Sequence, residues 1–322
     1  MRLPDFTLAR PRSLAEATEL ANDPRARIIA GGTDLVPNLR RGLEAPRTVV
    51  SLERLPELRK IEPYEGGLRI GACVPLARIL EQAQLPAALR EAAQSVGAPG
   101  HRNAGTIGGN LCLDTRCLYY NQSAEWRASH GYCLKRGGDI CHVAPKGKVC
   151  RAAFSGDLAP ALLALDARVE IAGPKNALGV KPLQDIYRDD GAHALTLAPG
   201  EIVAAILVPS ANLRSGYAKA RSRGAIDFPL AGVAMALALS RDKVKTLRVA
   251  LTGTNSCPIL LKGTEELVGR AADDALGSAI SKLVQKQAKP LRTTIGAADY
   301  RRQVAAVLAR RLLARLTHGD KQ

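Results

Sequence analysis

Cysteine residues are concentrated in one segment of this 322-residue chain. Five of the seven lie within 39 residues: Cys112, Cys117, Cys133, Cys141 and Cys150. Thiolates are soft ligands that suit zinc or iron, and four of them complete a [4Fe–4S] cluster. Zinc sites usually contain Cys-x2-Cys pairs, which this segment lacks. The spacing therefore favours a cluster, with zinc and unliganded thiols as the alternatives.

Two Gly-Gly turns form a second candidate site. The first lies in Ile28-Ile29-Ala30-Gly31-Gly32-Thr33-Asp34-Leu35, directly after an apolar strand, and the second in Thr106-Ile107-Gly108-Gly109-Asn110. Glycine permits the positive φ angles that turn successive backbone N–H groups toward an anion. Two such turns, each beside a threonine, indicate a nucleotide diphosphate held from two sides. Neither is GxGxxG or a P-loop, which disfavours a Rossmann site and an ATPase.

The elements that must position these residues predict an α+β fold. Strands are expected at 6–8, 27–30, 48–52, 60–72 (as a hairpin), 168–172, 202–208, 216–220, 231–240 and 246–252. Helices are expected at 13–20, 76–82, 86–96, 158–165, 263–287 and 297–316, the last one basic and amphipathic. The cysteine segment, residues 112–154, has no sustained period. A Gly/Pro-containing stretch at 173–182 indicates a boundary between two domains, residues 1–178 and 179–322.

Basic residues outnumber acidic ones by 46 to 30, and the net charge of +16 is unevenly distributed. Residues 101–150 carry +4 and residues 201–322 carry +11. Nucleic-acid binding usually adds exposed aromatic residues to such charge, but only 3% of this chain is aromatic. A solvated basic face or a docking surface for an acidic protein is expected instead. Five basic residues of the cysteine segment would also offset the charge of a cluster: Lys135, Arg136, Lys146, Lys148 and Arg151.

The composition excludes a disordered chain, because 46% of the residues are hydrophobic and 24% are charged. The longest apolar run, Pro229 to Leu239, is far shorter than the ~20 residues of a membrane span. The first residues lack the apolar region of a secretory signal. The sequence therefore predicts a soluble cytoplasmic protein, in which disulfides are uncommon.

Four motifs in order along the chain resemble the FAD subunits of the xanthine oxidase family of molybdenum hydroxylases. They are Ala30–Leu35, Arg102–Leu111, Gly156–Leu165, and Tyr217-Ala218-Lys219 with Asp227-Phe228-Pro229. The resemblance implies a two-part FAD domain of the vanillyl-alcohol-oxidase (PCMH-like) type and a smaller C-terminal domain like that of the CO dehydrogenase flavoprotein. It also implies FAD on the two glycine turns, with further contacts from Asp157 and Lys219. The residues implied in the first turn are Ile28, Ile29, Ala30, Gly31, Gly32, Thr33, Asp34 and Leu35, and those in the second are Thr106, Ile107, Gly108, Gly109 and Asn110.

The cysteine segment is an insertion relative to most flavin subunits of this family. Its stretch Arg116–Ser123, with cysteines 16, 24 and 33 positions beyond Cys117, resembles the flavin subunits of 4-hydroxybenzoyl-CoA reductases. Those subunits carry an additional [4Fe–4S] cluster in this insertion. The resemblance implies Cys117, Cys133, Cys141 and Cys150 as its ligands, with Cys112 as a non-ligating cysteine.

The implied function is electron relay within a larger enzyme. Ferredoxin would reduce the cluster and the cluster would reduce FAD. Electrons would then reach a small subunit with two [2Fe–2S] clusters and a large molybdopterin subunit that dehydroxylates an aromatic CoA thioester. The expected assembly is a dimer of heterotrimers without nucleic-acid or membrane partners, and this chain supplies no acid or base. The alternative is the flavin subunit of another xanthine-dehydrogenase-like hydroxylase; a zinc-stabilised nucleic-acid-binding protein is the remote alternative.

Overall fold

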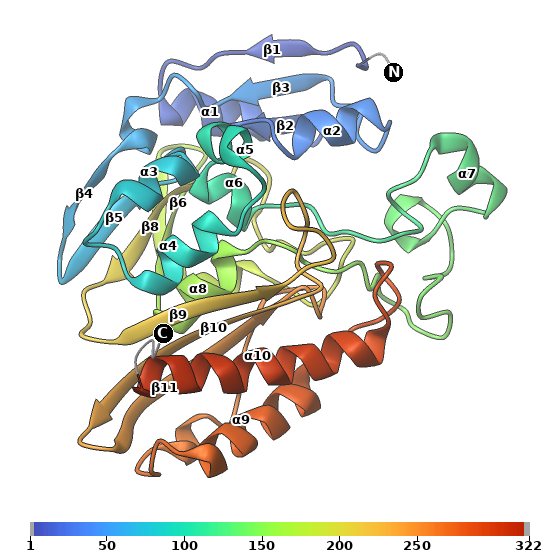
Figure 1. Ribbon diagram of the computed structural model, residues 1–322. Coiled ribbons are helices and arrows are strands. Elements are labelled where there is room, and N and C mark those ends of the chain that lie inside the picture. The colour runs from blue at the N-terminus through green and yellow to red at the C-terminus, as the bar shows by residue number, and fades with distance from the viewer. Residues whose placement is uncertain (1–2, 319–322) are drawn as a thin grey trace.

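The computed structural model of the chain describes residues 3–318, which form three β-sheets with helices between and outside them (Figure 1). The N-terminal sheet is parallel, with the order β1-β3-β2. Its strands are β1 (Thr7–Ala9), β2 (Ala26–Ile29) and β3 (Thr48–Ser51). Helix α1 (Leu14–Ala21) packs against this sheet and begins where expected, because the Ser13 hydroxyl accepts a hydrogen bond from the Glu16 N–H.

The second sheet is antiparallel and has five strands in the order β4-β5-β8-β6-β7. They are β4 (Ile61–Tyr64), β5 (Gly67–Gly71), β6 (Arg168–Gly173), β7 (Ala177–Pro182) and β8 (Ile202–Pro209). The expected domain boundary at 178/179 cuts through β7 and separates β8 from the two strands it pairs with. Because β8 lies inside this sheet, we place the division between the domains after β8.

The third sheet is antiparallel, has the order β12-β11-β10-β9 and is covered on one face by two long helices (Figure 1). Its strands are β9 (Arg214–Ala220), β10 (Ala231–Ser240), β11 (Lys243–Thr252) and β12 (Ile259–Leu260), and the helices are α9 (Asp274–Gln287) and α10 (Ala298–His318). The prediction of one helix over 263–287 was wrong at its start. Helix α9 begins where the Asp273 carboxylate accepts a hydrogen bond from the Leu276 N–H, and the residues before it contain a short 3₁₀ turn.

Helix α8 (Leu158–Ala164) lies in the centre of the molecule, and all seven of its residues are buried. It packs on β10 and β11, and it shares one hydrophobic core with the five-stranded sheet. A helix that is apolar all round is typical of such a position between layers. The remaining helices of the first domain are α2 (Leu35–Arg40), α3 (Leu76–Glu81), α4 (Ala87–Gln94), α5 (Pro99–Ala104), α6 (Ile107–Leu111) and α7 (Ala124–Ser129). Within residues 3–318, no helix is long and apolar enough to cross a membrane.

Two arginines expected on the basic face of α10 are structural ties instead. Arg301 is 1% exposed, and its guanidinium donates hydrogen bonds to the backbone carbonyls of Leu230 and Leu291. Arg315 forms an ion pair with Glu91 of α4 at 2.6 Å. Part of the predicted basic surface therefore holds the C-terminal domain together and joins it to the first domain.

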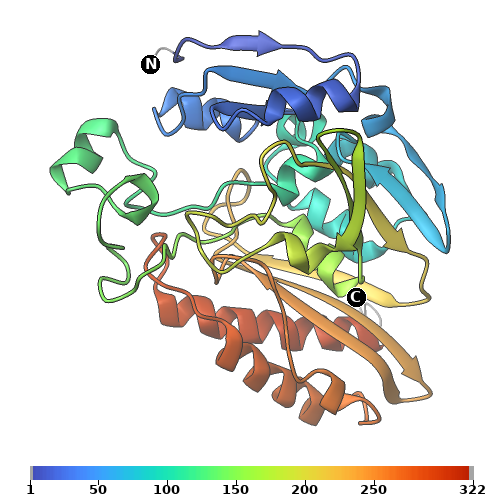
Figure 2. The same ribbon diagram turned by 180° about the vertical axis from the view of Figure 1, so that it is seen from behind.

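The cysteine segment projects from one side of the molecule (Figures 1 and 2). Its regular elements are α7 and a 3₁₀ turn, in agreement with the lack of a sustained period in its sequence. The buried side chain of Arg127 ties the segment to the N-terminal part of the chain by donating a 3.2 Å hydrogen bond to the Gly42 carbonyl. Loops and side-chain contacts, rather than strands, give this segment its shape.

Candidate functional site

The first glycine turn connects β2 to α2 and presents a row of free backbone donors. Gly32 adopts φ +70°, a conformation that favours glycine. Among residues 3–318, no acceptor is found for the backbone N–H groups of the five residues 31–35. Such a concave row of amide N–H groups suits the oxygens of a phosphate or diphosphate.

The two glycine motifs are in direct contact, although about seventy residues separate them in the sequence. A Cβ atom on Gly31 would lie 1.8 Å from the carbonyl oxygen of Ala104, so any side chain here would separate the motifs. The second Gly-Gly pair belongs to the short helix α6 rather than to an open turn. The Thr106 hydroxyl caps this helix by accepting a hydrogen bond from the Gly109 N–H at 3.1 Å, and a Cβ on Gly108 would lie 2.6 Å from that of Ala72.

A buried ion pair joins the first domain to the C-terminal sheet beside α6. The Lys219 ammonium lies 2.9 Å from Oδ2 of Asp157, and both side chains are at most 5% exposed. The Tyr217 hydroxyl donates a 2.6 Å hydrogen bond to the other carboxylate oxygen. Burial raises the pKa of the Asp157 carboxyl, while Lys219 and Tyr217 act in the opposite direction. Asn110 adds a link from α6, because its Oδ1 accepts a hydrogen bond from the Leu158 N–H at 3.0 Å.

Tyr217 had no role in the sequence-based prediction. The available signal was its place two residues before Lys219, because residues i and i+2 of a strand share one face. With Tyr217 on one oxygen and Lys219 on the other, both carboxylate oxygens of Asp157 have partners.

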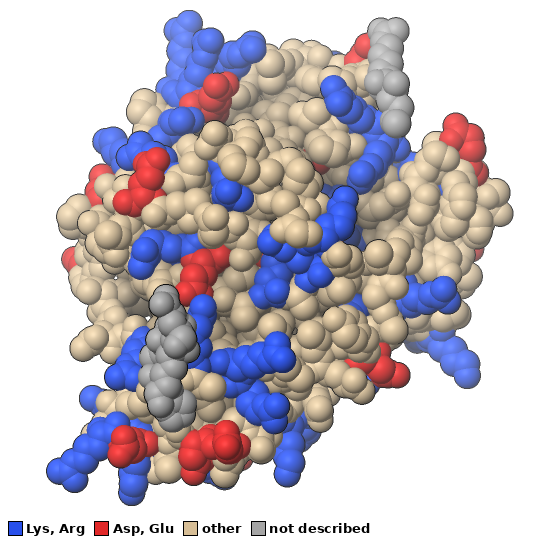
Figure 3. Space-filling view, in the orientation of Figure 1, with Lys and Arg blue, Asp and Glu red and all other residues tan. Residues whose placement is uncertain are grey.

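Three parts of the chain meet beside the first turn. The Asp34 carboxylate forms an ion pair with Arg116 of the cysteine segment, whose guanidinium lies 5.0 Å from the ring centroid of Phe228. Phe228 belongs to the loop between β9 and β10 and is 45% exposed, and Ile28 at the end of β2 is also exposed. Lys and Arg side chains gather across the middle of the face shown in Figure 3. Exposed apolar groups beside free N–H donors and basic residues suit a ligand with a ring system and a diphosphate.

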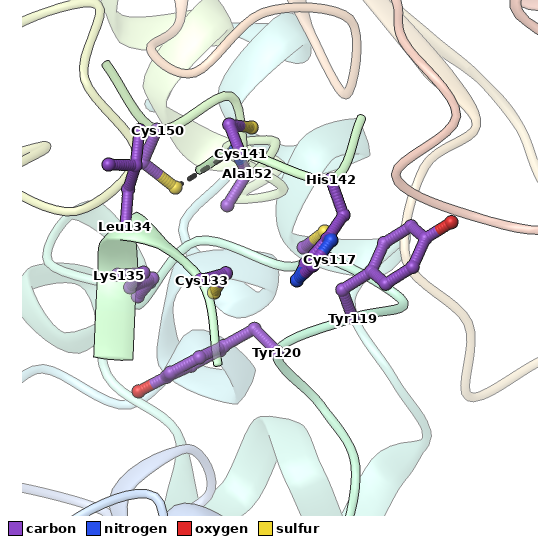
Figure 4. A pocket seen from close by; sticks show the side chains of 10 residues that line it. All are labelled: Cys117, Tyr119, Tyr120, Cys133, Leu134, Lys135, Cys141, His142, Cys150 and Ala152. Carbon is purple, nitrogen blue, oxygen red and sulfur yellow. Dashed lines mark hydrogen bonds between the residues drawn. The ribbon is translucent and has the colours of Figure 1, made fainter. Parts of the chain in front are cut away.

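The four predicted cluster ligands lie together. Cys117, Cys133, Cys141 and Cys150 are all buried and line one cavity, which Figure 4 shows from close by. Cys112 lies outside this cavity. In the described part of the chain, no three His, Cys, Asp or Glu side chains converge closely enough to hold a single metal ion. The four buried thiols around one cavity match the donor set of a [4Fe–4S] cluster, which takes four thiolates.

A backbone donor points at one of these sulfur atoms. The Cys150 Sγ accepts a hydrogen bond from the Ala152 N–H at 3.4 Å. Burial raises the pKa of the Cys150 thiol to about 12 and also raises that of Cys117. Because ligands must be thiolates, the positive charge of bound metal would have to offset this burial.

Of the five basic residues expected to offset the charge of a cluster, Lys135 alone lines the cavity. Its charge favours the thiolate form of Cys150. The other four lie outside the cavity lining. The side chains of Arg136, Lys146 and Lys148 are exposed, and Arg151 forms an ion pair with Asp189 at 2.7 Å. Close charge compensation therefore depends on Lys135.

His142 and Tyr119 also line the cavity, although the sequence-based prediction preferred Cys117 to a histidine as ligand and gave Tyr119 no role. Their rings stack with centroids 4.9 Å apart, and Trp126 of α7 lies 5.9 Å from Tyr119. The Nε2 atom of His142 is hydrogen-bonded to the Tyr132 carbonyl, so this ring supports the loop that carries Cys133. The concentration of aromatic residues near the cysteines was the signal for this packing.

Comparison with known proteins identifies the family. Residues 4–211 match the FAD binding domain in molybdopterin dehydrogenase, and residues 215–316 match the CO dehydrogenase flavoprotein C-terminal domain. The chain belongs to the FAD-binding subunits of the xanthine oxidase family of molybdenum hydroxylases. The two matches meet between β8 and β9, where the sheets also divide.

Curated relatives of this flavin subunit cover most of its length. The FAD-binding subunit of an aldehyde oxidoreductase from Escherichia coli (strain K12) is 33% identical over 83% of this chain and 87% of the relative. The carbon monoxide dehydrogenase medium chain of Afipia carboxidovorans is 29% identical over 96% of both chains. The xanthine dehydrogenase FAD-binding subunit of Escherichia coli O157:H7 is 26% identical over 95% of this chain and 94% of the relative.

A solved structure agrees with these relatives. A chain of the Cu,Mo-CO dehydrogenase in its cyanide-inactivated form superposes with a TM-score of 0.80 and 26% identity over 99% of both chains. The predicted α+β fold with an FAD domain and a flavoprotein C-terminal domain is confirmed, and so is a subunit of a multi-subunit oxidoreductase. The relatives' names support the broader of the two predicted functions, a flavin subunit of a xanthine-dehydrogenase-like hydroxylase, better than the narrower one.

Proposed function

We propose that this flavin subunit carries a [4Fe–4S] cluster on Cys117, Cys133, Cys141 and Cys150 in addition to FAD. The observation that supports the cluster is the single cavity lined by these four buried thiols, with a backbone N–H donor on the sulfur of Cys150. Cys112 is left without a metal. The insertion 112–154 thus adds a second redox centre to the flavin domain.

The FAD site combines the first glycine turn, α6 and the start of α8. Residues 31–35 offer the free N–H groups for the diphosphate, and residues 28–30 supply the strand end that precedes them. Residues 106–110 contribute α6 to the proposed site, with Asp157 and Lys219 next to them; the N–H groups of residues 107–110 already have acceptors within the protein, so the diphosphate is assigned to the first turn. These side chains orient the cofactor and exclude water from it; none is positioned for acid or base work on a substrate.

When bound, the two cofactors supply one- and two-electron transfer, which is the chemistry of this chain in its complex. The proposed partners are a large molybdopterin subunit and a small subunit with two [2Fe–2S] clusters, assembled as a dimer of heterotrimers in the cytoplasm. A ferredoxin is the proposed donor, because it is a small acidic one-electron carrier and this chain has a net charge of +16.

We propose reductive dehydroxylation of 4-hydroxybenzoyl-CoA as the reaction of the whole complex. It is supported by the stretch Arg116–Ser123 and by the cysteine spacing after it. The second candidate is hydroxylation of another substrate by a xanthine-dehydrogenase-like enzyme, which the relatives' names favour. The substrate binds to the large subunit, so only the assembled complex distinguishes the two.

The test is cofactor analysis of the anaerobically purified complex, followed by assay. This chain, separated from its partners under anaerobic conditions, should contain about four irons, about four acid-labile sulfides and one FAD. Zinc in place of iron would contradict the cluster, and absence of FAD would contradict the flavin site. The complex is then assayed with reduced ferredoxin and 4-hydroxybenzoyl-CoA, and with xanthine and aldehydes as electron donors; turnover of the latter two alone supports the second candidate.

A further inference from the structure

Lys135 reaches from the cysteine cavity toward the flavin turn. Its side chain is 6% exposed, and its ammonium donates hydrogen bonds to Oδ1 of Asp114 at 2.6 Å and to the Thr115 carbonyl at 3.2 Å. The same ammonium lies 4.5 Å above the ring of Tyr120, which lines the cavity with it (Figure 4). This buried ammonium group therefore fixes residues 114 and 115, which lead into Cys117.

The same segment also binds the first glycine turn. The Asp114 N–H donates a 3.1 Å hydrogen bond to Oδ2 of Asp34, and Arg116 forms an ion pair with that carboxylate. Arg116 also donates a 3.0 Å hydrogen bond to Oδ1 of Asn38, one turn further along α2. Residues 114–116 thus form a strap between the two sites.

Asp34 occupies the N-cap position of α2, yet its carboxylate makes no capping hydrogen bond. An aspartate at this position usually accepts from the helix's own N–H groups. Here the carboxylate is committed to residues 114 and 116, eighty residues further along the chain. This exchange leaves the turn's N–H groups free and makes its shape depend on the cysteine segment.

We propose that the strap couples the two sites, so that filling the cysteine cavity tightens FAD binding at the first glycine turn, with Lys135 as the positioning residue. The inference rests on the proposed function, since it requires both cofactors. Cluster assembly fixes Cys117, which directly follows the strap, and Cys133, which lies two residues before Lys135. FAD then binds a first glycine turn whose contacts with the strap are already ordered. Because coupling between two binding sites is reciprocal, bound FAD also strengthens retention of the cluster by the same factor.

The experiment measures the FAD dissociation constant of the full-length, deflavinated chain with its cluster and after removal of the cluster. The expected ratio of the two constants is at least about fivefold, the lower end of typical coupling between sites. Lys135→Met should bring the ratio close to one, and Lys135→Arg, which keeps the charge, should restore part of it. Lys148 is an exposed lysine of the same segment, so the control variant Lys148→Met should leave the ratio unchanged.

The ratio separates coupling from mere loss of stability, because a structural defect would weaken FAD binding with and without the cluster alike. If Lys135→Met impairs folding through the unpaired Asp114, the double variant Lys135→Met, Asp114→Asn removes that charge. A wild-type ratio of one, or an unchanged ratio in the folded variants, would overturn the inference. Absence of iron from the wild-type chain would overturn the proposed cluster itself, so the two failures are distinguishable.

Discussion

The two cofactor regions of this subunit are built by different means. The flavin region consists of paired strands, capped helices and glycines in van der Waals contact with opposing backbone. The cysteine segment has one short helix and owes its shape to buried side chains such as Lys135 and Arg127. Backbone pairing persists without a ligand, whereas four buried thiols around a cavity need metal to complete their interactions. The first region is therefore preformed, whereas the second would be completed by the proposed cluster.

The largest expected effect is on the cofactor-dependent region. Cys133→Ser should abolish stable iron binding, because a hydroxyl is a poor ligand for a thiolate-held cluster, and FAD should be retained. Iron, sulfide and flavin are measured on the anaerobically purified chain. Cys257→Ser, a partly buried cysteine outside the cavity, is the matched control and should keep its iron. Full iron content in the Cys133 variant would remove this residue from the ligand set.

The preformed region should respond through global stability instead. Asp157→Ala leaves the buried ammonium of Lys219 without its partner, and breaking a buried pair in this way costs about 3–5 kcal/mol. Urea unfolding followed by circular dichroism measures this loss. The control is Glu81→Ala, which breaks an exposed ion pair with Arg78 and should cost less than about 1 kcal/mol. Equal losses in both variants would mean that the buried pair contributes no more than a surface pair.

A smaller and more local effect is expected at the contact between the two glycine motifs. Gly31→Ala places a methyl group against the Ala104 carbonyl, so the motifs must separate and FAD affinity should fall at least about tenfold, or 1.4 kcal/mol. Gly100→Ala is the control, because a Cβ there meets no atom within 4 Å. Flavin fluorescence titration gives both dissociation constants. Unchanged affinity in the Gly31 variant would show that this contact does not shape the flavin site.

The smallest effects are expected at two equivalent helix caps, one in each region. Ser13 and Ser123 each accept a hydrogen bond from the N–H three residues later, at 3.1 and 3.2 Å. Replacing either by alanine should cost about 1 kcal/mol. We expect the Ser13→Ala cost in global unfolding and the Ser123→Ala cost in local hydrogen exchange of α7, because α7 lies in a segment that contributes no strand to any of the three sheets. A global loss in both would contradict the contrast between the regions.

Sequence patterns predicted the parts of the fold that depend on local periodicity. The capping box at Ser13, the central helix and most strands of both domains were predictable from apolar spacing and turn residues. The place of β8 between β5 and β6 was not, because sheet partners are chosen by tertiary packing. Periodicity also placed Arg301 on a solvated face, although it is buried against backbone carbonyls.

The residues of the candidate site were more predictable from the sequence than the contacts that join them. Composition identified the cysteine segment, and the two glycine motifs stood out by residue type. The contact of Asp34 with Arg116 joins residues about eighty positions apart, and no local pattern encodes such a pairing. The same holds for Lys135, which could not be distinguished from surface lysines because four other basic residues lie near it in the sequence.

The position of α8 has a consequence for the motion of the two domains. This helix is buried on every side between the sheets of the two domains, and it consists of alanine, leucine and one proline. A hinge motion between the domains would have to expose it to water, at about 25 cal/mol for each Å² of apolar surface. The two domains are therefore held in a fixed relative arrangement, which keeps Asp157 at the start of α8 and Lys219 on β9 in place against each other.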